Sequence, residues 1–152
     1  MFIRSIFTTV EISATDGKET LAEATNVFTG GIYYAKKRGS SKKTEKTTVT
    51  VHEIVKDGTY AQIFGGGNLK RLCLEESQIV AFCRDHRNLL RTEGYGTFFL
   101  FKGEDAWFFI AVVDIDDGRL RVDVNDFSRC HVWSASSRHR VIVPQCPNQI
   151  AF

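Results

Sequence analysis

The sequence predicts a single α+β domain over residues 1–152, a curved and mainly antiparallel sheet of about seven or eight strands with two packed helices. The length is typical of one domain, and 43% hydrophobic with 25% charged residues is ordinary for a globular protein. Phe is frequent, with 12 residues, and Pro is rare, with 2, which favours strands. Short β-branched and aromatic runs separated by turn signals indicate the same class, and a small closed barrel is the alternative arrangement of these strands.

The first half of the chain predicts one strand, one helix and a three-stranded meander. Residues 2–12 are rich in β-branched and aromatic residues, as in a strand. Residues 16–28 start with a capping-box-like pair, Asp16 and Glu19, and then place apolar residues on one helical face. Residues 32–64 predict three strands, with Asp57-Gly58 as a two-residue turn. The segment 36–46 would then be the protruding tip of the first hairpin.

The second half predicts the longest helix and a second meander. The helix lies within residues 74–94, and its buried stripe is formed by Ile79, Cys83, His86 and Leu90. Residues 97–101, 106–115 and 119–127 predict three antiparallel strands, followed by short strands at 130–134 and 139–144. Residues 107–113, WFFIAVV, are continuously apolar, which predicts a strand covered on both faces, by the chain itself or by a second copy in a homodimer.

Positive charge is concentrated in one segment. Six of the eleven residues from 36 to 46 are Lys or Arg and only Glu45 opposes them, whereas the net charge of the chain is only +2. We expect this segment to contact nucleic acid or another polyanion, with a base stacking on an outward Tyr33 and with help from two cations after the glycines at 65–67. The predicted polyanion-binding residues are Tyr33, Lys36, Lys37, Arg38, Lys42, Lys43, Lys46, Lys70 and Arg71. The alternative is a solvated loop whose lysines deter aggregation.

A second polar and aromatic cluster lies near the C-terminus. Arg and Trp are enriched at binding hot spots, so this cluster predicts a surface for a protein partner. Its residues are Arg129, His131, Trp133, Arg138 and Arg140. The corresponding function is a protein-binding inhibitor or adaptor, for example a mobile-element anti-defence protein that occupies the surface of a partner.

An enzyme is the third hypothesis, and no residue pattern in the chain has the spacing that a known catalytic or metal site requires. Cys83 with His86 and Cys130 with His131 are weak zinc pairs, because zinc motifs use closer recurring pairs. Ser137 and His139 lack a nucleophile elbow. Residues 114–118, DIDDG, lack the closing Glu of a calcium loop and predict a hairpin turn. We therefore expect no catalytic residue, no metal and no cofactor.

The cysteines and the N-terminus predict a cytoplasmic protein. The four cysteines are widely spaced and include no CxxC pair, so we expect packed thiols. Residues 1–13 contain no long apolar signal region, and no apolar run approaches the roughly 18–20 residues that span a bilayer. We accordingly expect no membrane partner.

Overall fold

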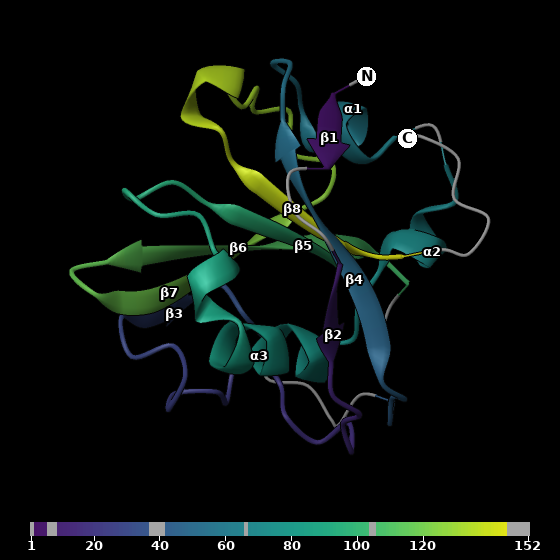
Figure 1. Ribbon diagram of the computed structural model, residues 1–152, viewed down its shortest axis with the longest axis vertical. Helices are drawn as coiled ribbons and strands as arrows, with labels where there is room; N and C mark the ends of the chain where they lie inside the picture. The colour runs from purple at the N-terminus through teal and green to yellow at the C-terminus, as the bar shows by residue number, and fades with distance from the viewer. Residues whose placement is uncertain (1, 6–8, 37–41, 66, 104–105, 146–152) are drawn as a thin grey trace.

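The computed structural model describes residues 2–5, 9–36, 42–65, 67–103 and 106–145. Its eight strands are β1 (Ile3–Ser5), β2 (Val10–Ile12), β3 (Gly31–Tyr33), β4 (Thr47–Ile54), β5 (Thr97–Lys102), β6 (Phe108–Asp116), β7 (Arg119–Asp126) and β8 (Arg140–Pro144). They form one sheet in the order β1-β4-β8-β5-β6-β7-β3, and β2 pairs with β4 next to β1. The predicted α+β class is confirmed (Figure 1).

The sheet is mixed and open. Most pairs are antiparallel, but β3 pairs with β7 and β5 pairs with β8 in parallel. The strand path has β1 at one end and β3 at the other, so the strands do not close into a barrel. The predicted meander of β5, β6 and β7 is confirmed. Its second turn is Asp117-Gly118, whose positive φ angles of 51° and 76° are those of a type I′ hairpin.

Both faces of the central strands are covered by the chain itself (Figure 1). Helix α3 (Glu76–Asp85) and the segment 13–30 pack on one face, where β5 contributes Phe99 and Phe101. The short helices α1 (Tyr60–Phe64) and α2 (Leu69–Leu72) pack on the other. The apolar run in β6 therefore divides its side chains between two cores, which explains that run without a second copy.

The helix predicted over residues 16–28 is wrong. This segment forms turns, although Leu21, Ala24 and Phe28 are buried against α3 as their spacing suggested. The backbone N–H of Leu21 donates to Glu76 Oε1 at 3.0 Å, and the Asp16 carboxylate accepts from the backbone of Lys18. Local turn bonds, such as Phe28 N–H to Ala24 O at 3.0 Å, and these side-chain bonds hold the backbone here, because tertiary contacts outweigh weak helix propensity.

The meander predicted over residues 32–64 is also wrong. β3 pairs with β7, and β4 pairs with β1, β2 and β8, so β3 and β4 are not the two strands of a hairpin. Residues 59–64 are not a strand but contain α1, which starts with a capping box between Thr59 and Gln62. Asp57-Gly58 is not a type I′ turn; Gly58 instead forms an isolated bridge with Trp133.

Three boundaries differ from the predictions. Residues 2–12 form two short strands, β1 and β2, instead of one. Helix α3 ends at Asp85, and the chain continues as the 3₁₀ turn η1 (Arg87–Leu89). Residues 130–134 contribute only the bridge at Trp133, which precedes the 3₁₀ turn η2 (Ala135–Ser137), whereas the final predicted strand is confirmed as β8.

Candidate functional site

The predicted basic segment is divided between two places. Lys36 follows β3 and lies beside β6 and β7, whereas Lys42, Lys43 and Lys46 precede β4. Lys37 and Arg38 lie outside the described residues. The described parts of the segment thus belong to two separate places, beside β7 and before β4.

The second part is anchored beside the start of α3. The backbone N–H of Lys42 donates to Glu75 Oε1 at 3.0 Å. Thr44 pairs with Thr15 through backbone bonds in both directions, and Thr15 Oγ1 lies 2.7 Å from Ser77 Oγ. These bonds hold residues 42–44 against the first turn of α3 and leave the side chains of Lys42 and Lys43 exposed.

The other predicted basic residues lie just before the same helix. Lys70 and Arg71 are exposed on α2, whose C-cap residue Cys73 leads directly to Glu75. Burial raises the pKa of the Cys73 thiol to about 12, Glu75 adds to this rise, and the charge of Lys102 at the end of β5 opposes it. We call the exposed cations around this junction the basic end; they are Lys42, Lys43, Lys70, Arg71 and Lys102.

Lys46 contributes less to this surface. Its Nζ lies 3.4 Å from Glu11 Oε2, and the two side chains are 68% and 57% exposed. Exposed pairs of this kind contribute little stability, but they offset the charge that a phosphate would otherwise meet. The glycine segment before α2 adds no phosphate loop of recognised pattern, and the Asn68 side chain already accepts the N–H of Lys70.

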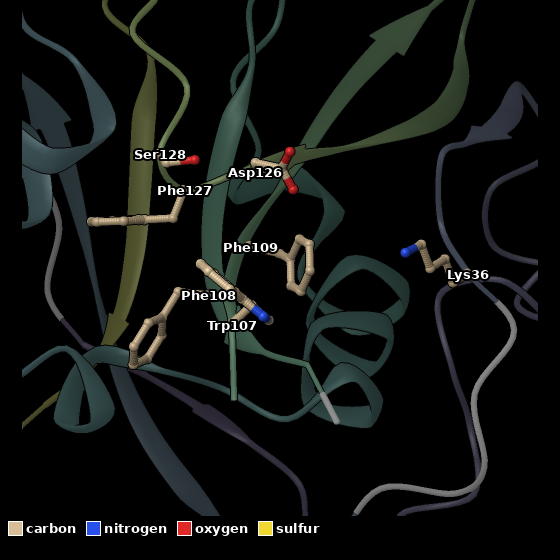
Figure 2. A pocket seen from close by; sticks show the side chains of 7 residues that line it. All are labelled: Lys36, Trp107, Phe108, Phe109, Asp126, Phe127 and Ser128. Atoms are coloured by element: carbon tan, nitrogen blue, oxygen red, sulfur yellow. The ribbon is translucent and has the colours of Figure 1, made fainter. Parts of the chain in front are cut away.

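The first part of the basic segment borders an aromatic groove. Figure 2 shows Lys36 extending toward Phe109 and Asp126 from the segment that follows β3. The groove has a volume of about 490 Å³ and wraps around the start of β6 and the end of β7. Its lining residues are Lys36, Trp107, Phe108, Phe109, Asp126, Phe127 and Ser128. Trp107 is 67% exposed, which is unusual for so large an apolar side chain.

Two further hollows adjoin this groove along β7. One, of about 420 Å³, lies between Tyr34–Lys36 and the side chains of Phe109, Val124 and Asp126. The other, of about 490 Å³, has Asp123, Asn125, Asp126, Ser128, Arg129 and Tyr34 in its lining. Tyr34 belongs to both and is 82% exposed, with a left-handed φ of 62°. We call the three connected hollows the β7-edge groove.

A buried polar network contacts two residues that line the β7-edge groove, Asn125 and Arg129. The hydroxyl of the fully buried Tyr60 donates to Asn125 Oδ1 at 2.7 Å, and Arg129 Nη1 donates to the same oxygen at 2.8 Å. Burial raises the pKa of Tyr60 well above its ordinary value, so its hydroxyl stays protonated. Burial also raises the pKa of the Asp123 carboxyl, although Arg129 and Arg121 oppose the rise.

Tyr33 is 46% exposed at the edge of the sheet. Its ring centroid lies 6.0 Å from the guanidinium carbon of Arg121, which also makes two hydrogen bonds of 3.0 and 2.9 Å to Asp114. Asp114 is therefore an ion-pair residue of the β6–β7 hairpin, and the turn interpretation of residues 114–118 is confirmed.

The predicted protein-binding cluster is partly used by the fold. Trp133 packs its ring 4.9 Å from Phe98 and 5.0 Å from His139, measured between ring centroids. Arg140 Nη1 donates to Leu89 O at 2.7 Å, and so ties β8 to η1. Three of the five residues remain exposed: His131 beside Trp133, Arg138 after η2, and Arg129 in the β7-edge groove.

Cys83, His86 and His139, three members of the candidate catalytic pairs, are each buried or bonded to the backbone. Cys83 is buried, and its burial raises the pKa of the thiol well above neutrality. His86 places Nε2 2.7 Å from the backbone oxygen of Glu11. His139 Nδ1 accepts the N–H of Gly96 at 2.9 Å, and burial lowers the pKa of this imidazole. His86 and His139 thus bond to the backbone, and Cys83 remains a protonated thiol.

The two weak zinc pairs lie on opposite sides of the sheet. Cys83 belongs to the core under α3, whereas Cys130 and His131 are close to Trp133, which packs on the core under α1. Within the described ranges, no group of three or more His, Cys, Asp or Glu side chains is arranged to hold a metal ion. Among these same residues, no helix is both long and apolar enough to cross a membrane.

Sequence reasoning missed the β7-edge groove and the contribution of Lys102. Trp107, near the start of the strand predicted over residues 106–115, was the available signal, because an aromatic residue at a strand end is often half-exposed. The comparisons with protein-family models, curated proteins and solved structures find no match to this chain.

Proposed function

We propose that the protein is a binding module that contacts nucleic acid or another polyanion through the basic end. The hydrogen bond from the Lys42 backbone to Glu75 carries this proposal, since it brings the basic segment beside the helix that follows Lys70 and Arg71. Cations from three separate parts of the sequence then gather around one junction. Two carboxylates belong to this part of the surface: Glu75, which accepts the backbone N–H of Lys42, and the exposed Glu45, two residues after Lys43.

The chemistry of this surface favours phosphate groups along a backbone over one compact anion. The cations are exposed and have long side chains, which suits several separate phosphate contacts. Each contact releases counterions from a nucleic acid, so affinity falls steeply with salt. Four such contacts predict a loss of about 50- to 150-fold in affinity between 50 and 200 mM salt.

The test measures binding of labelled 20-nucleotide single-stranded and double-stranded DNA and RNA at both salt concentrations. The test variant replaces Lys42, Lys43, Lys70 and Arg71 with Gln. The matched control makes the same replacement at four exposed cations outside the proposed surfaces, Arg4, Lys18, Lys56 and Arg119. Both variants lose the same net charge, and only the first loses the basic end.

We expect the wild type and the control to bind with a steep salt dependence, and the test variant to lose most of its affinity and a corresponding part of the salt slope. Equal losses in the two variants would assign the binding to net charge and overturn the proposal. Absence of binding by the wild type at 50 mM salt would overturn it as well.

A further inference from the structure

The outer edge of β7 is only partly paired. β3 ends at Tyr33, which lies opposite Asp123 in the parallel register. The left-handed φ of 62° at Tyr34 then turns the chain away from β7. Within the described residues, Val124–Asp126 therefore have β6 on one side and no strand on the other.

The main chain of this edge is oriented outward at alternate residues. The N–H of Phe127 donates to Phe108 on the β6 side, whereas the carbonyl of Leu120 accepts from Gly30 on the β3 side. Hydrogen-bonding directions alternate along a strand, so even-numbered residues of β7 point their N–H and C=O groups away from β6. The C=O of Val124 and the N–H of Asp126 are thus oriented toward a strand lying alongside, whereas the C=O of Asp126 accepts the N–H of Arg129 at 3.1 Å.

Hollows lie on both faces of this edge. The hollow on the α3 side is lined by Ala35, Phe109 and Val124 and is largely apolar between the charges of its rim. The hollow on the opposite face is lined by Asp123 and Asn125, with Arg129 beside them. A strand points successive side chains to opposite faces, so a strand added here would fill the two hollows in turn. Each volume is within the range of small ligand sites.

The charges of the two hollows indicate which side chains fit. In the polar hollow Asp123 and Asp126 meet one cation, Arg129, which is already bonded to Asn125, and Lys36 approaches Asp126 from the adjoining hollow. Burial raises the pKa of the Asp123 carboxyl, and the charges of Arg129 and Arg121 lower it by less. The two arginines therefore compensate only part of the cost of burying this carboxylate. A cationic side chain would offset it further, whereas a phosphate would be repelled by two carboxylates.

We propose that an extended peptide segment of a partner protein, with alternating apolar and basic side chains, adds as a strand to the edge of β7 at Val124–Asp126. Its main chain bonds to these two residues, an apolar side chain enters the hollow beside Phe109, and the neighbouring Lys or Arg pairs with Asp123 and Asp126. This is peptide recognition by strand addition, in which main-chain bonds provide affinity and alternate pockets provide specificity.

The test follows the backbone amide signals of the ¹⁵N-labelled full chain by NMR during titration with capped hexapeptides. The probe is VKVKVK, and the comparison peptides are VVVKKK, with the same composition but no alternation, and VEVEVE, with the opposite charge. We expect saturable shifts at residues 34–36 and 123–128 with VKVKVK, and at least tenfold weaker binding of the other two. Equal binding of VEVEVE, or shifts centred elsewhere, would overturn the proposal.

Two further arms separate strand addition from simple charge attraction. VKVKVK peptides N-methylated at every Val or at every Lys each remove one set of main-chain donors, and only one set faces β7. One methylated peptide should therefore lose binding and the other keep it; loss by both or by neither would contradict strand addition. The protein variant Asp123→Asn/Asp126→Asn should weaken VKVKVK about fivefold, whereas Asp116→Asn/Asp117→Asn at the far end of the hairpin should leave it unchanged.

Discussion

Acidification should destabilise this protein through His52. The side chain lies in β4 opposite Val141 of β8 and is only 6% exposed. Burial lowers the pKa of this imidazole from 6.5 to about 4, because the charged form is poorly solvated inside the protein. The unfolded chain therefore binds a proton at mildly acidic pH that the folded protein does not.

The sign and size of the effect follow from these two pKa values. Stability is fully present above about pH 6.5 and is lost progressively as the pH falls toward 4, since the unfolded state takes up more protons in that window. Between pH 7 and pH 5 the loss attributable to His52 is about 2 kcal/mol. A loss of this size is a large fraction of the stability of a typical domain.

The assay is urea unfolding at pH 7 and pH 5 for the wild type, His52→Val and the exposed-site control His131→Gln. Valine suits a buried strand position, and His139, whose pKa is lowered mainly by burial and least by the charge of His131, titrates in all three proteins. We expect His52→Val to lose about 2 kcal/mol less than the wild type over this pH interval, and the control to match the wild type. An unchanged pH dependence in His52→Val would refute burial as the cause.

Three other predictions concern the thiols, a tight glycine and the buried tyrosine. Iodoacetamide at pH 8 should modify the exposed Cys130 within minutes and spare the buried Cys83 until the protein unfolds. Peptide mass spectrometry measures both modifications, and early modification of Cys83 would contradict its burial. Gly65→Ala should lower the free energy of unfolding in urea by about 2 kcal/mol, because the new Cβ meets the carbonyl of Ala61. Gly67→Ala has open space around the new Cβ and should lower it by under about 0.5 kcal/mol. Similar losses in the two variants would refute the close contact at Gly65. Tyr60→Phe should cost about 1–2 kcal/mol by removing the hydroxyl from Asn125, and an unchanged free energy of unfolding would show that this hydrogen bond contributes nothing net.

Much of the sheet follows from local pattern. The run WFFIAVV predicts a doubly covered strand, and β6 is one, with Ile110 and Val112 in one core and Ala111 and Val113 in the other. Asp117-Gly118 predicts a tight hairpin because both residues tolerate positive φ angles. Such elements depend on residues close in sequence and on the pattern of buried residues, and both can be predicted from the sequence.

The failures have two causes: a local capping signal at residues 59–64, and distant partners around Leu21 and β3. Residues 59–64 have strand-like composition, yet the capping box between Thr59 and Gln62 starts a helix that buries Tyr60. The segment around Leu21 has helical spacing, yet the Leu21 backbone bonds to Glu76, 55 residues away. β3 precedes β4 in the chain but pairs with β7, because pairing depends on where each strand finds a free edge.

The sequence by itself determined the α+β class, the β5–β6–β7 meander and the concentration of positive charge, because periodicity, turn residues and net charge are local properties. Only the tertiary structure decided where that charge lies, since it divides the segment between the start of α3 and the β7-edge groove. The groove itself is formed by residues around 34, 107 and 126, which come together because β3 leaves β7 after Tyr33. Contacts between residues so far apart depend on chain topology, which local pattern does not specify.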